Sequence, residues 1–414
     1  MKLRKINIAT ILPAALLFFS CESFHDADLA KDIQYCSLDI ELESPDYSIS
    51  GEGLTVTVTN IDKGYSIEKE TTGKSIHIDS IIPGIHNISI SGAIEDQDKK
   101  KIFLNGERLK YPLIEDRETL QIEMKGSQLG PVIFKEIFYS GTANFYFRNQ
   151  FYELYNNSEE TVYLDGLFFA DLYPTKATLM TPVWPPEDKG NYVYAERVWK
   201  FPGTGTEYPL APGESCVISQ FAANHKLPQY NPNSPIDGTS SEFEFNMNNK
   251  NYPDQKAPDM VHVFYDGKAE MGGAPQYLTS VFGGAYVIFR PNGDEIYDPV
   301  NNKSLQTKDL SKNSSIFAKV PIRYVWDAVE AGDNESMLKA KRVPGVLDAG
   351  MTYVGATYNS LGVARKKIGE RADGTPLLQD TNNSTNDFDR GVVPQFRRYH
   401  SKMPSWNHTL KENK

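Results

Sequence analysis

Three stretches of the sequence decide the fold class: VIFKEIFYSG (132–141), QFYELYNNS (150–158) and VYLDGLFFA (162–170). Each is a short run rich in β-branched and aromatic residues, which is typical of β-strands. The Asn156-Asn157-Ser158 turn separates the second run from the third. The pattern predicts an all-β chain, which we expect to form two Ig-like β-sandwich domains, the second with long loop insertions.

The residues before these strands show the same kind of pattern over a shorter length. Leu54 to Thr59 alternates apolar and polar residues with period two, and turn pairs such as Pro83-Gly84 and Asn105-Gly106 separate one run from the next. Alternation of this kind is typical of strands with one buried face. The sequence therefore predicts a small antiparallel β-sandwich over residues 37–127.

The length of the chain supports a division into two units. A chain of 414 residues is longer than one hydrophobic core usually organises. The stretch GSQLGP (126–131) is rich in turn residues and marks the boundary. We expect the second domain to cover residues 132–395 and residues 396–414 to form a C-terminal tail.

Scattered blocks resemble a known family. LAPGESCVIS (210–219) and LQDTNNSTNDF (378–388), taken with the three opening strands, resemble an uncharacterised family of bacterial lipoproteins that carry a lamin-tail-like, Ig-like domain. The segment IHIDSIIPG (76–84), followed by IHNISI (85–90), resembles the transthyretin-like and carboxypeptidase-regulatory-like modules. The resemblance implies modules that serve adhesion or attachment, and no catalytic set of residues is carried over with it.

The N-terminal segment resembles the signal sequence of bacterial lipoproteins. Lys2, Arg4 and Lys5 precede an apolar stretch from Ile6 to Phe19, and a small Ser20 stands directly before Cys21. We expect residues 1–20 to be removed, Cys21 to be acylated and residues 21–36 to form a tether to a membrane. The predicted location is the bacterial cell envelope, as an outer-membrane lipoprotein, with the periplasmic and the external face both left open.

Composition excludes some partners. There are 43 Lys and Arg against 54 Asp and Glu, a net charge of −11, so nucleic acid is not an expected partner. The two cysteines beyond Cys21, Cys36 and Cys216, have no second Cys or His at zinc-ligand spacing. We expect two isolated buried thiols, with a disulfide between them as the alternative.

The predicted second domain contains long inserts that are rich in Tyr, Trp and Asn. Exposed rings beside amide groups commonly meet glycan or protein ligands, and the candidate ligand-binding residues are Trp184, Tyr192, Tyr194 and Trp199. The alternative for each ring is that it covers an end of the sandwich.

Motifs of catalysis are absent from the sequence. It contains no H-E-x-x-H, no G-x-S-x-G and no EF-hand loop. The run from Asp380 to Asp389 offers oxygen ligands for Ca²⁺, but we favour a structural role in which Asp380 or Asp387 pairs with Arg365 or Lys366.

No cofactor or metal is therefore predicted. The expected function is a non-catalytic envelope lipoprotein that recognises a glycan or protein ligand, or that partners an outer-membrane import receptor. The alternative is an envelope-associated hydrolase with a site in the inserted loops.

Overall fold

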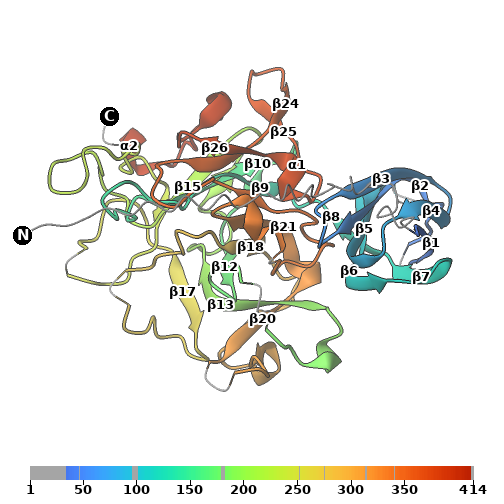
Figure 1. Ribbon diagram of the computed structural model, residues 1–414. Coiled ribbons are helices and arrows are strands. Elements are labelled where there is room, and N and C mark those ends of the chain that lie inside the picture. Colours follow the sequence, from blue (N-terminus) through green and yellow to red (C-terminus); the bar gives the residue numbers. More distant parts are fainter. Residues whose placement is uncertain are drawn as a thin grey trace, which may run out of the picture.

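The computed structural model describes residues 34–45, 47–95, 101–178, 182–250, 252–274, 276–312, 315–339 and 341–411. The expected signal (1–20), Cys21 and most of the expected tether lie outside the described residues. The chain is almost entirely β, and the prediction of an all-β chain of β-sandwich domains with long inserted loops is confirmed. Figure 1 shows two units lying side by side, here named the first sandwich (36–128) and the second sandwich (132–411).

The first sandwich packs a three-stranded sheet on a five-stranded sheet. In spatial order, the smaller sheet is β4 (Ser75–Ile81), β1 (Cys36–Glu43) and β7 (Glu118–Glu123). The larger sheet is β3 (Ser66–Thr72), β2 (Glu52–Asn60), β5 (Gly84–Glu95), β6 (Lys101–Leu113) and β8 (Lys125–Gln128). Strands β1 and β7 run parallel, whereas the other pairs are antiparallel.

Alternation in the sequence places the core of the first sandwich. Leu38 and Ile40 from β1 face Val56 and Val58 from β2, and all four are fully buried. Because successive side chains in a strand point to opposite faces, the intervening polar residues remain at the surface.

The second sandwich packs a six-stranded sheet on a larger one. In spatial order, the six-stranded sheet is β16 (Phe243–Glu244), β15 (Ser215–Ser219), β10 (Phe151–Asn156), β9 (Val132–Phe138), β23 (Gly362–Arg365) and β26 (Phe388–Val392). The larger sheet is β19 (Gln306–Thr307), β20 (Phe317–Pro321), β13 (Tyr192–Lys200), β12 (Phe168–Leu172), β18 (Ala285–Phe289), β21 (Val325–Gly332) and β22 (Thr352–Tyr353), with β17 (Val261–Tyr265) also paired to β13.

Short ribbons and helical turns complete the described elements. The ribbons are β11 (Val162–Tyr163) with β14 (Pro209–Leu210), and β24 (Lys367–Glu370) with β25 (Pro376–Leu378). The helical turns are η2 (Pro186–Asp188), η3 (Lys303–Leu305), η4 (Ile322–Tyr324), η5 (Glu335–Lys339), η6 (Arg398–His400), α1 (Ser384–Asp387) and α2 (His408–Lys411). Within the described ranges, none of these helices has the length and apolar character required to cross a bilayer.

Both faces of the larger sheet are covered. Phe169 and Tyr286 point into the core between the sheets, whereas Phe168 and Val287 point into a second apolar layer on the outer face. Strands buried on both faces read as continuous apolar runs rather than as alternating ones. This is why the stretch of sequence that forms β12 lacks the regular alternation of the first sandwich. Strands β9 and β10 of the six-stranded sheet are also buried along their whole length and lack this alternation too.

The LAPG block forms a turn between sheets. Glu214 N donates to Ala211 O at 3.0 Å, and Gly213 at φ +81° supplies the left-handed residue that the turn requires. Strand β14 before the turn pairs with β11, whereas β15 after it pairs with β10. The turn therefore connects two different sheets.

The segment 396–411, which the sequence suggested to be a tail, packs on the second sandwich. Arg398 Nε donates to Glu136 Oε2 at 2.7 Å, and Lys135 Nζ donates to Ser401 Oγ at 2.7 Å. Glu136 and Lys135 are fully buried in β9. The C-terminal segment thus supplies the counter-charge of the buried Glu136. It also gives a further hydrogen bond to Lys135, whose Nζ donates to Glu153 Oε1 at 2.8 Å.

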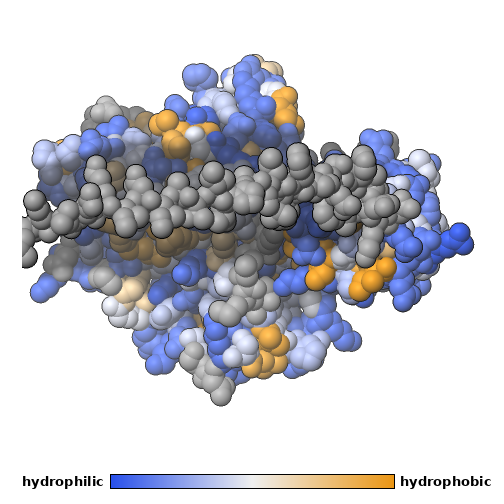
Figure 2. Space-filling model, viewed as in Figure 1, coloured by the Kyte–Doolittle hydropathy of each residue, from blue (hydrophilic) through white to orange (hydrophobic). Residues whose placement is uncertain are grey.

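Direct hydrogen bonds join the two sandwiches. Ser127 Oγ donates to Val346 O at 3.0 Å and accepts from Asn382 Nδ2 at 2.8 Å. Gly130 N donates to Trp326 O at 3.1 Å. The surface in the view of Figure 2 is mostly hydrophilic, with apolar residues in separate patches. Cys36 and Cys216 are buried and free, as expected, because each lies in the core of a different sandwich.

Candidate functional site

Three of the four candidate rings come together beside the start of β13. The loop before this strand carries Trp184, whose indole stacks on the ring of Tyr194 with centroids 3.9 Å apart and planes at 12°. Tyr192 lies two residues earlier on the same face of the strand, since side chains alternate along β13. All three side chains are partly exposed.

Buried polar contacts fix these rings. Tyr194 Oη donates to Asp188 Oδ2 at 3.0 Å, and Lys319 Nζ donates to Asp188 Oδ1 at 2.7 Å. Lys319 Nζ also lies 4.4 Å from the centroid of the Tyr192 ring. Burial, together with the neighbouring Asp188, raises the pKa of Tyr194, so its hydroxyl stays protonated and keeps donating.

The rings line a pocket of about 350 Å³, here named the aromatic pocket. Its lining residues are Trp184, Pro185, Pro186, Lys189, Gly190, Tyr192, Tyr194, Arg342 and Pro344. A second hollow of about 180 Å³ shares Trp184 and Arg342 with it. The two hollows are therefore neighbours with a common wall.

The two cationic residues of the aromatic pocket, Arg342 and Lys189, differ in their hydrogen bonds and in their exposure to solvent. Arg342 Nε donates to Glu330 Oε1 at 2.8 Å, its Nη1 donates to Pro174 O at 2.9 Å, and its side chain is buried. Lys189 is exposed and has left-handed backbone angles at the end of η2. Arg342 thus belongs to the fixed wall, whereas Lys189 is the cation that a ligand at the surface can reach. Sequence reasoning missed both residues. Arg342 arrives from a segment more than 140 positions away, whereas Lys189 stands between Trp184 and Tyr192 and its place beside the candidate rings was a usable signal.

The prediction that Trp199, the fourth candidate, binds a ligand is wrong. Trp199 is 0% exposed and lies in the core between the sheets, where Phe245 packs against it with ring centroids 5.1 Å apart. In this position the indole has no surface for a ligand.

A β-bulge in β13 sets the face on which Trp199 lies, which is the face that also carries Tyr194. Asp171 pairs with Arg197 and Leu172 pairs with Ala195, so Glu196 is an extra residue. Ala195 and Val198 consequently share the outer apolar layer, and Trp199 turns inward. No sequence motif marks this bulge.

Another hollow lies between the sandwiches. It measures about 470 Å³ and includes Tyr47 from the first sandwich and Arg323 and Trp326 from the second. Much of its wall is the connecting segment 126–131. It has fewer rings than the aromatic pocket, and we do not assign a ligand to it.

The Asp380–Asp389 run has the expected structural role. Arg365 Nη1 lies 3.1 Å from Asp380 Oδ1 and 3.4 Å from Asp387 Oδ2, and all three side chains are buried. Asp387 also accepts from Thr381 N at 2.9 Å. These carboxylates thus hold the closing turn against β23.

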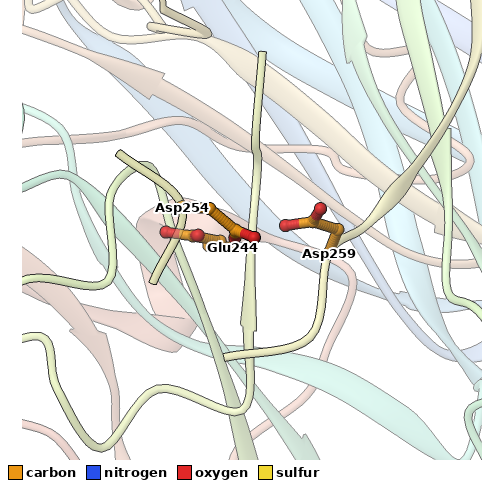
Figure 3. Close-up of side chains that lie close together, drawn as sticks. All are labelled: Glu244, Asp254 and Asp259. Carbon is orange, nitrogen blue, oxygen red and sulfur yellow. The ribbon is translucent and has the colours of Figure 1, made fainter. Parts of the chain in front are cut away.

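Sequence reasoning also missed a group of carboxylates at the end of β16 and in the insert between β16 and β17. Glu244, Asp254 and Asp259 each place a carboxylate oxygen within 4.8 Å of the others (Figure 3). Their spacing of ten and five residues matches no motif, since the fold of the loop brings them together. We name this group the carboxylate cluster.

The fold defines a two-sandwich, all-β protein with its surface pocket on the second sandwich. Residues 211–395 match the family described as protein of unknown function (DUF4876). Among solved structures, the chain is similar to a DUF4876 family protein from Bacteroides thetaiotaomicron. The two share 56% identity over 91% of this chain and 100% of that chain, with a TM-score of 0.67. The comparison with curated proteins gave no match. The chain belongs to the DUF4876 family.

Proposed function

We propose that this chain is a lipid-anchored binding lipoprotein of the bacterial cell envelope that captures a glycan in the aromatic pocket. The observation that carries the proposal is the Trp184–Tyr194 stack, which holds two large rings at the surface. Rings offer apolar faces to the CH groups of a sugar, and nearby polar groups meet its hydroxyls.

The size of the pocket favours a small ligand. About 350 Å³ lies at the lower end of the range of roughly 300–1,000 Å³ for small-molecule sites. That volume suits a short segment of a polysaccharide rather than a folded protein domain. Lys189 at the rim adds a donor for hydroxyl or acidic groups.

The proposed location follows from the N-terminal sequence. An acylated Cys21 would tether the two sandwiches to the outer membrane, and an import receptor in that membrane is the proposed protein partner. The resemblance of the second sandwich to lamin-tail-like attachment modules supports binding rather than chemistry. Labelling cells with radioactive palmitate tests the anchor, and equal label in the parent and in Cys21→Ala would overturn it.

One observation favours the alternative of a hydrolase. The carboxylate cluster lies in an inserted loop, and paired carboxylates are the groups that glycoside hydrolysis uses. However, the hollow beside Glu244 measures only about 10 Å³, which is room for about one water molecule and not for a sugar. We therefore place recognition in the aromatic pocket.

A glycan array tests the proposed function. The purified protein is expected to bind one class of polysaccharide, and Trp184→Ala is expected to weaken that binding at least about tenfold. Tyr163→Ala, which removes an exposed ring outside the aromatic pocket, is the matched control and should bind as the parent does. Binding that is unchanged in Trp184→Ala, or release of sugar during the assay, would contradict the proposal.

A further inference from the structure

The aromatic pocket and the second hollow beside it are lined by apolar surface and by hydrogen-bond donors. The charged side chains of the aromatic pocket are Lys189 and Arg342, and those of the second hollow are Lys341 and Arg342. Among the described residues, neither lining includes an Asp, Glu, Asn or Gln. The chain has 54 acidic residues against 43 basic ones, so composition alone would not produce two neighbouring hollows without a carboxylate.

Two buried carboxylates lie behind the lining rather than in it. Asp188 accepts from Tyr194 Oη at 3.0 Å, and Glu330 Oε1 accepts from Arg342 Nε at 2.8 Å. The two carboxylate residues are 4% and 0% exposed. A ligand in the aromatic pocket therefore contacts Tyr194 and Arg342, and not the carboxylate that each of them binds.

A lysine of the first sandwich lies at the rim of the same pocket. A Cβ atom at Gly190, which lines the aromatic pocket, would lie 3.7 Å from Nζ of Lys125 in β8. None of the ion pairs between described residues includes Lys125 or Lys189. Two ammonium groups, one from each sandwich, thus stand beside the pocket with their charge available to a ligand.

The guanidinium of Arg342 also keeps donors for a ligand. Its Nη1 donates to Pro174 O at 2.9 Å and its Nη2 donates to Ala331 O at 3.0 Å. A guanidinium has five N–H groups, so one N–H on each Nη atom remains beyond these bonds and the bond of Nε to Glu330. The three bonds hold the group in one orientation at the wall that the two hollows share.

The balance of donors and acceptors selects the ligand. A hydroxyl group of a neutral sugar donates a hydrogen bond, so a site for neutral sugars needs acceptors such as carboxylate or amide oxygens. Carboxylate and sulfate groups only accept, and their hydrogen bonds with ammonium or guanidinium groups are stronger than those between neutral partners. The linings described above therefore favour a sugar that carries an acidic group.

We propose that the aromatic pocket takes an acidic glycan, whose sugars carry carboxylate or sulfate groups, and that Lys125 and Lys189 contact these groups from opposite sandwiches. The inference rests on the proposed function and names the class of its ligand. The rings of Trp184 and Tyr192 supply the apolar faces for the sugar. The first sandwich thereby takes part in binding and does more than space the second sandwich from the membrane.

An exposed carboxylate beside the pocket gives the proposal a second sign. Glu187 stands two residues before Lys189 in η2, outside the lining, and is exposed. Its charge reaches the pocket, since it contributes to the raised pKa of Tyr194. Removing this carboxylate should therefore strengthen the binding of an acidic glycan, whereas removing either lysine should weaken it.

A glycan array followed by calorimetry tests the class of ligand. The glycans that bind should carry uronic acid or sulfate groups. For the tightest of them, reduction of the carboxyl groups to alcohols or removal of the sulfate groups by solvolysis should weaken binding at least about tenfold. The treatment that weakens binding shows which of the two acidic groups is recognised. Raising NaCl from about 0.05 M to about 0.5 M should also weaken binding, because exposed charges are screened.

Matched variants test the residues. Lys125→Gln and Lys189→Gln should each weaken binding of the acidic glycan about threefold, and Glu187→Gln should strengthen it about twofold. Lys226→Gln removes an exposed lysine outside both hollows and should bind as the parent does.

Two results would overturn the inference and leave the proposed function standing. One is that the bound glycans are neutral and that Trp184→Ala still weakens their binding. The other is that an acidic glycan binds equally to the parent and to the Lys125→Gln/Lys189→Gln double variant, again with a loss in Trp184→Ala. Absence of binding to every glycan, or binding that does not depend on Trp184, would instead overturn the proposed function and this inference with it.

Discussion

Arg365 and Asp327 form a buried ion pair that connects the two sheets of the second sandwich. Arg365 Nη2 donates to Asp327 Oδ2 at 2.8 Å, from β23 in the six-stranded sheet to β21 in the larger one. Asp327 Oδ2 also accepts from Phe134 N at 2.7 Å, and Arg365 Nε donates to Phe134 O at 2.8 Å. The pair therefore ties β9 and its neighbour β23 in the six-stranded sheet to β21 in the larger sheet.

Replacing Arg365 with Met should destabilise the protein by about 3–5 kcal/mol, because it leaves buried carboxylates without a counter-charge. Guanidinium unfolding measures the effect. Lys367→Met, which removes an exposed cation two residues away, should change stability by no more than about 0.5 kcal/mol. Similar losses in the two variants would show that the buried pair has no special role.

The contact between Arg398 and Glu136 predicts a dependence on pH. Burial raises the pKa of Glu136 to about 7, above its ordinary 4.5, although Arg398 opposes the shift. Between about pH 4.5 and 7, the Glu136 carboxyl therefore keeps its proton in the folded state but loses it in the unfolded state. Because the folded state binds more protons there, the free energy of unfolding falls as pH rises through that window. Arg398→Ala should remove the opposing cation, raise the pKa of Glu136 further and extend the fall to higher pH.

Unfolding curves at pH 5 and pH 8 check this prediction. Arg398→Ala should lose about 2–4 kcal/mol at pH 8 and less at pH 5. Arg398→Ala combined with Glu136→Gln should show a smaller difference between the two pH values, whereas Arg390→Ala, at an exposed site, should behave as the parent does. A loss in Arg398→Ala that is the same at both pH values would contradict the assigned cause.

Gly130 allows the close contact of the connecting segment with the second sandwich. A Cβ atom at this position would lie 2.3 Å from Cβ and 2.6 Å from Cα of Trp326. Gly130→Ala should therefore push the segment away from Trp326, at a cost of about 1–3 kcal/mol. We expect thermolysin to cleave this variant faster near residues 125–131, and we expect its radius of gyration to be larger than that of the parent.

Gly73→Ala is the control, because a Cβ at Gly73 would meet nothing within 4 Å. Equal cleavage of both variants would refute the role of Gly130.

The Trp184–Tyr194 stack predicts a spectroscopic change that needs no ligand. Tyr194→Ala should uncover one face of the indole of Trp184, increase quenching by acrylamide and shift the emission to longer wavelength. Tyr194→Phe keeps the ring and loses only the bond to Asp188, so its quenching should stay close to that of the parent. If Tyr194→Ala also left quenching unchanged, the two rings would not be stacked in solution.

Much of the fold follows from local sequence. Period-two alternation marks β1 and β2, because a strand presents alternate residues to one face. The Pro83-Gly84 pair marks the boundary between β4 and β5, whereas the expectation of a turn at Asn105-Gly106 is wrong, because both residues pair with β5 inside β6. The pairing of Arg365 with Asp380 and Asp387 also followed from residue types, since a buried guanidinium requires carboxylates close by.

The sequence by itself therefore determined the all-β class, the sandwich units and the kind of ring that lines the candidate site. Only the tertiary structure decided that Tyr194 lies at the surface and Trp199 in the core. The extra residue Glu196 turns Trp199 to the face that carries Tyr194, and the opposite sheet packs against that face at Trp199 but not at Tyr194. Likewise, Glu244 and Asp259 meet because a returning chain pairs with β16, a long-range contact that no local pattern encodes.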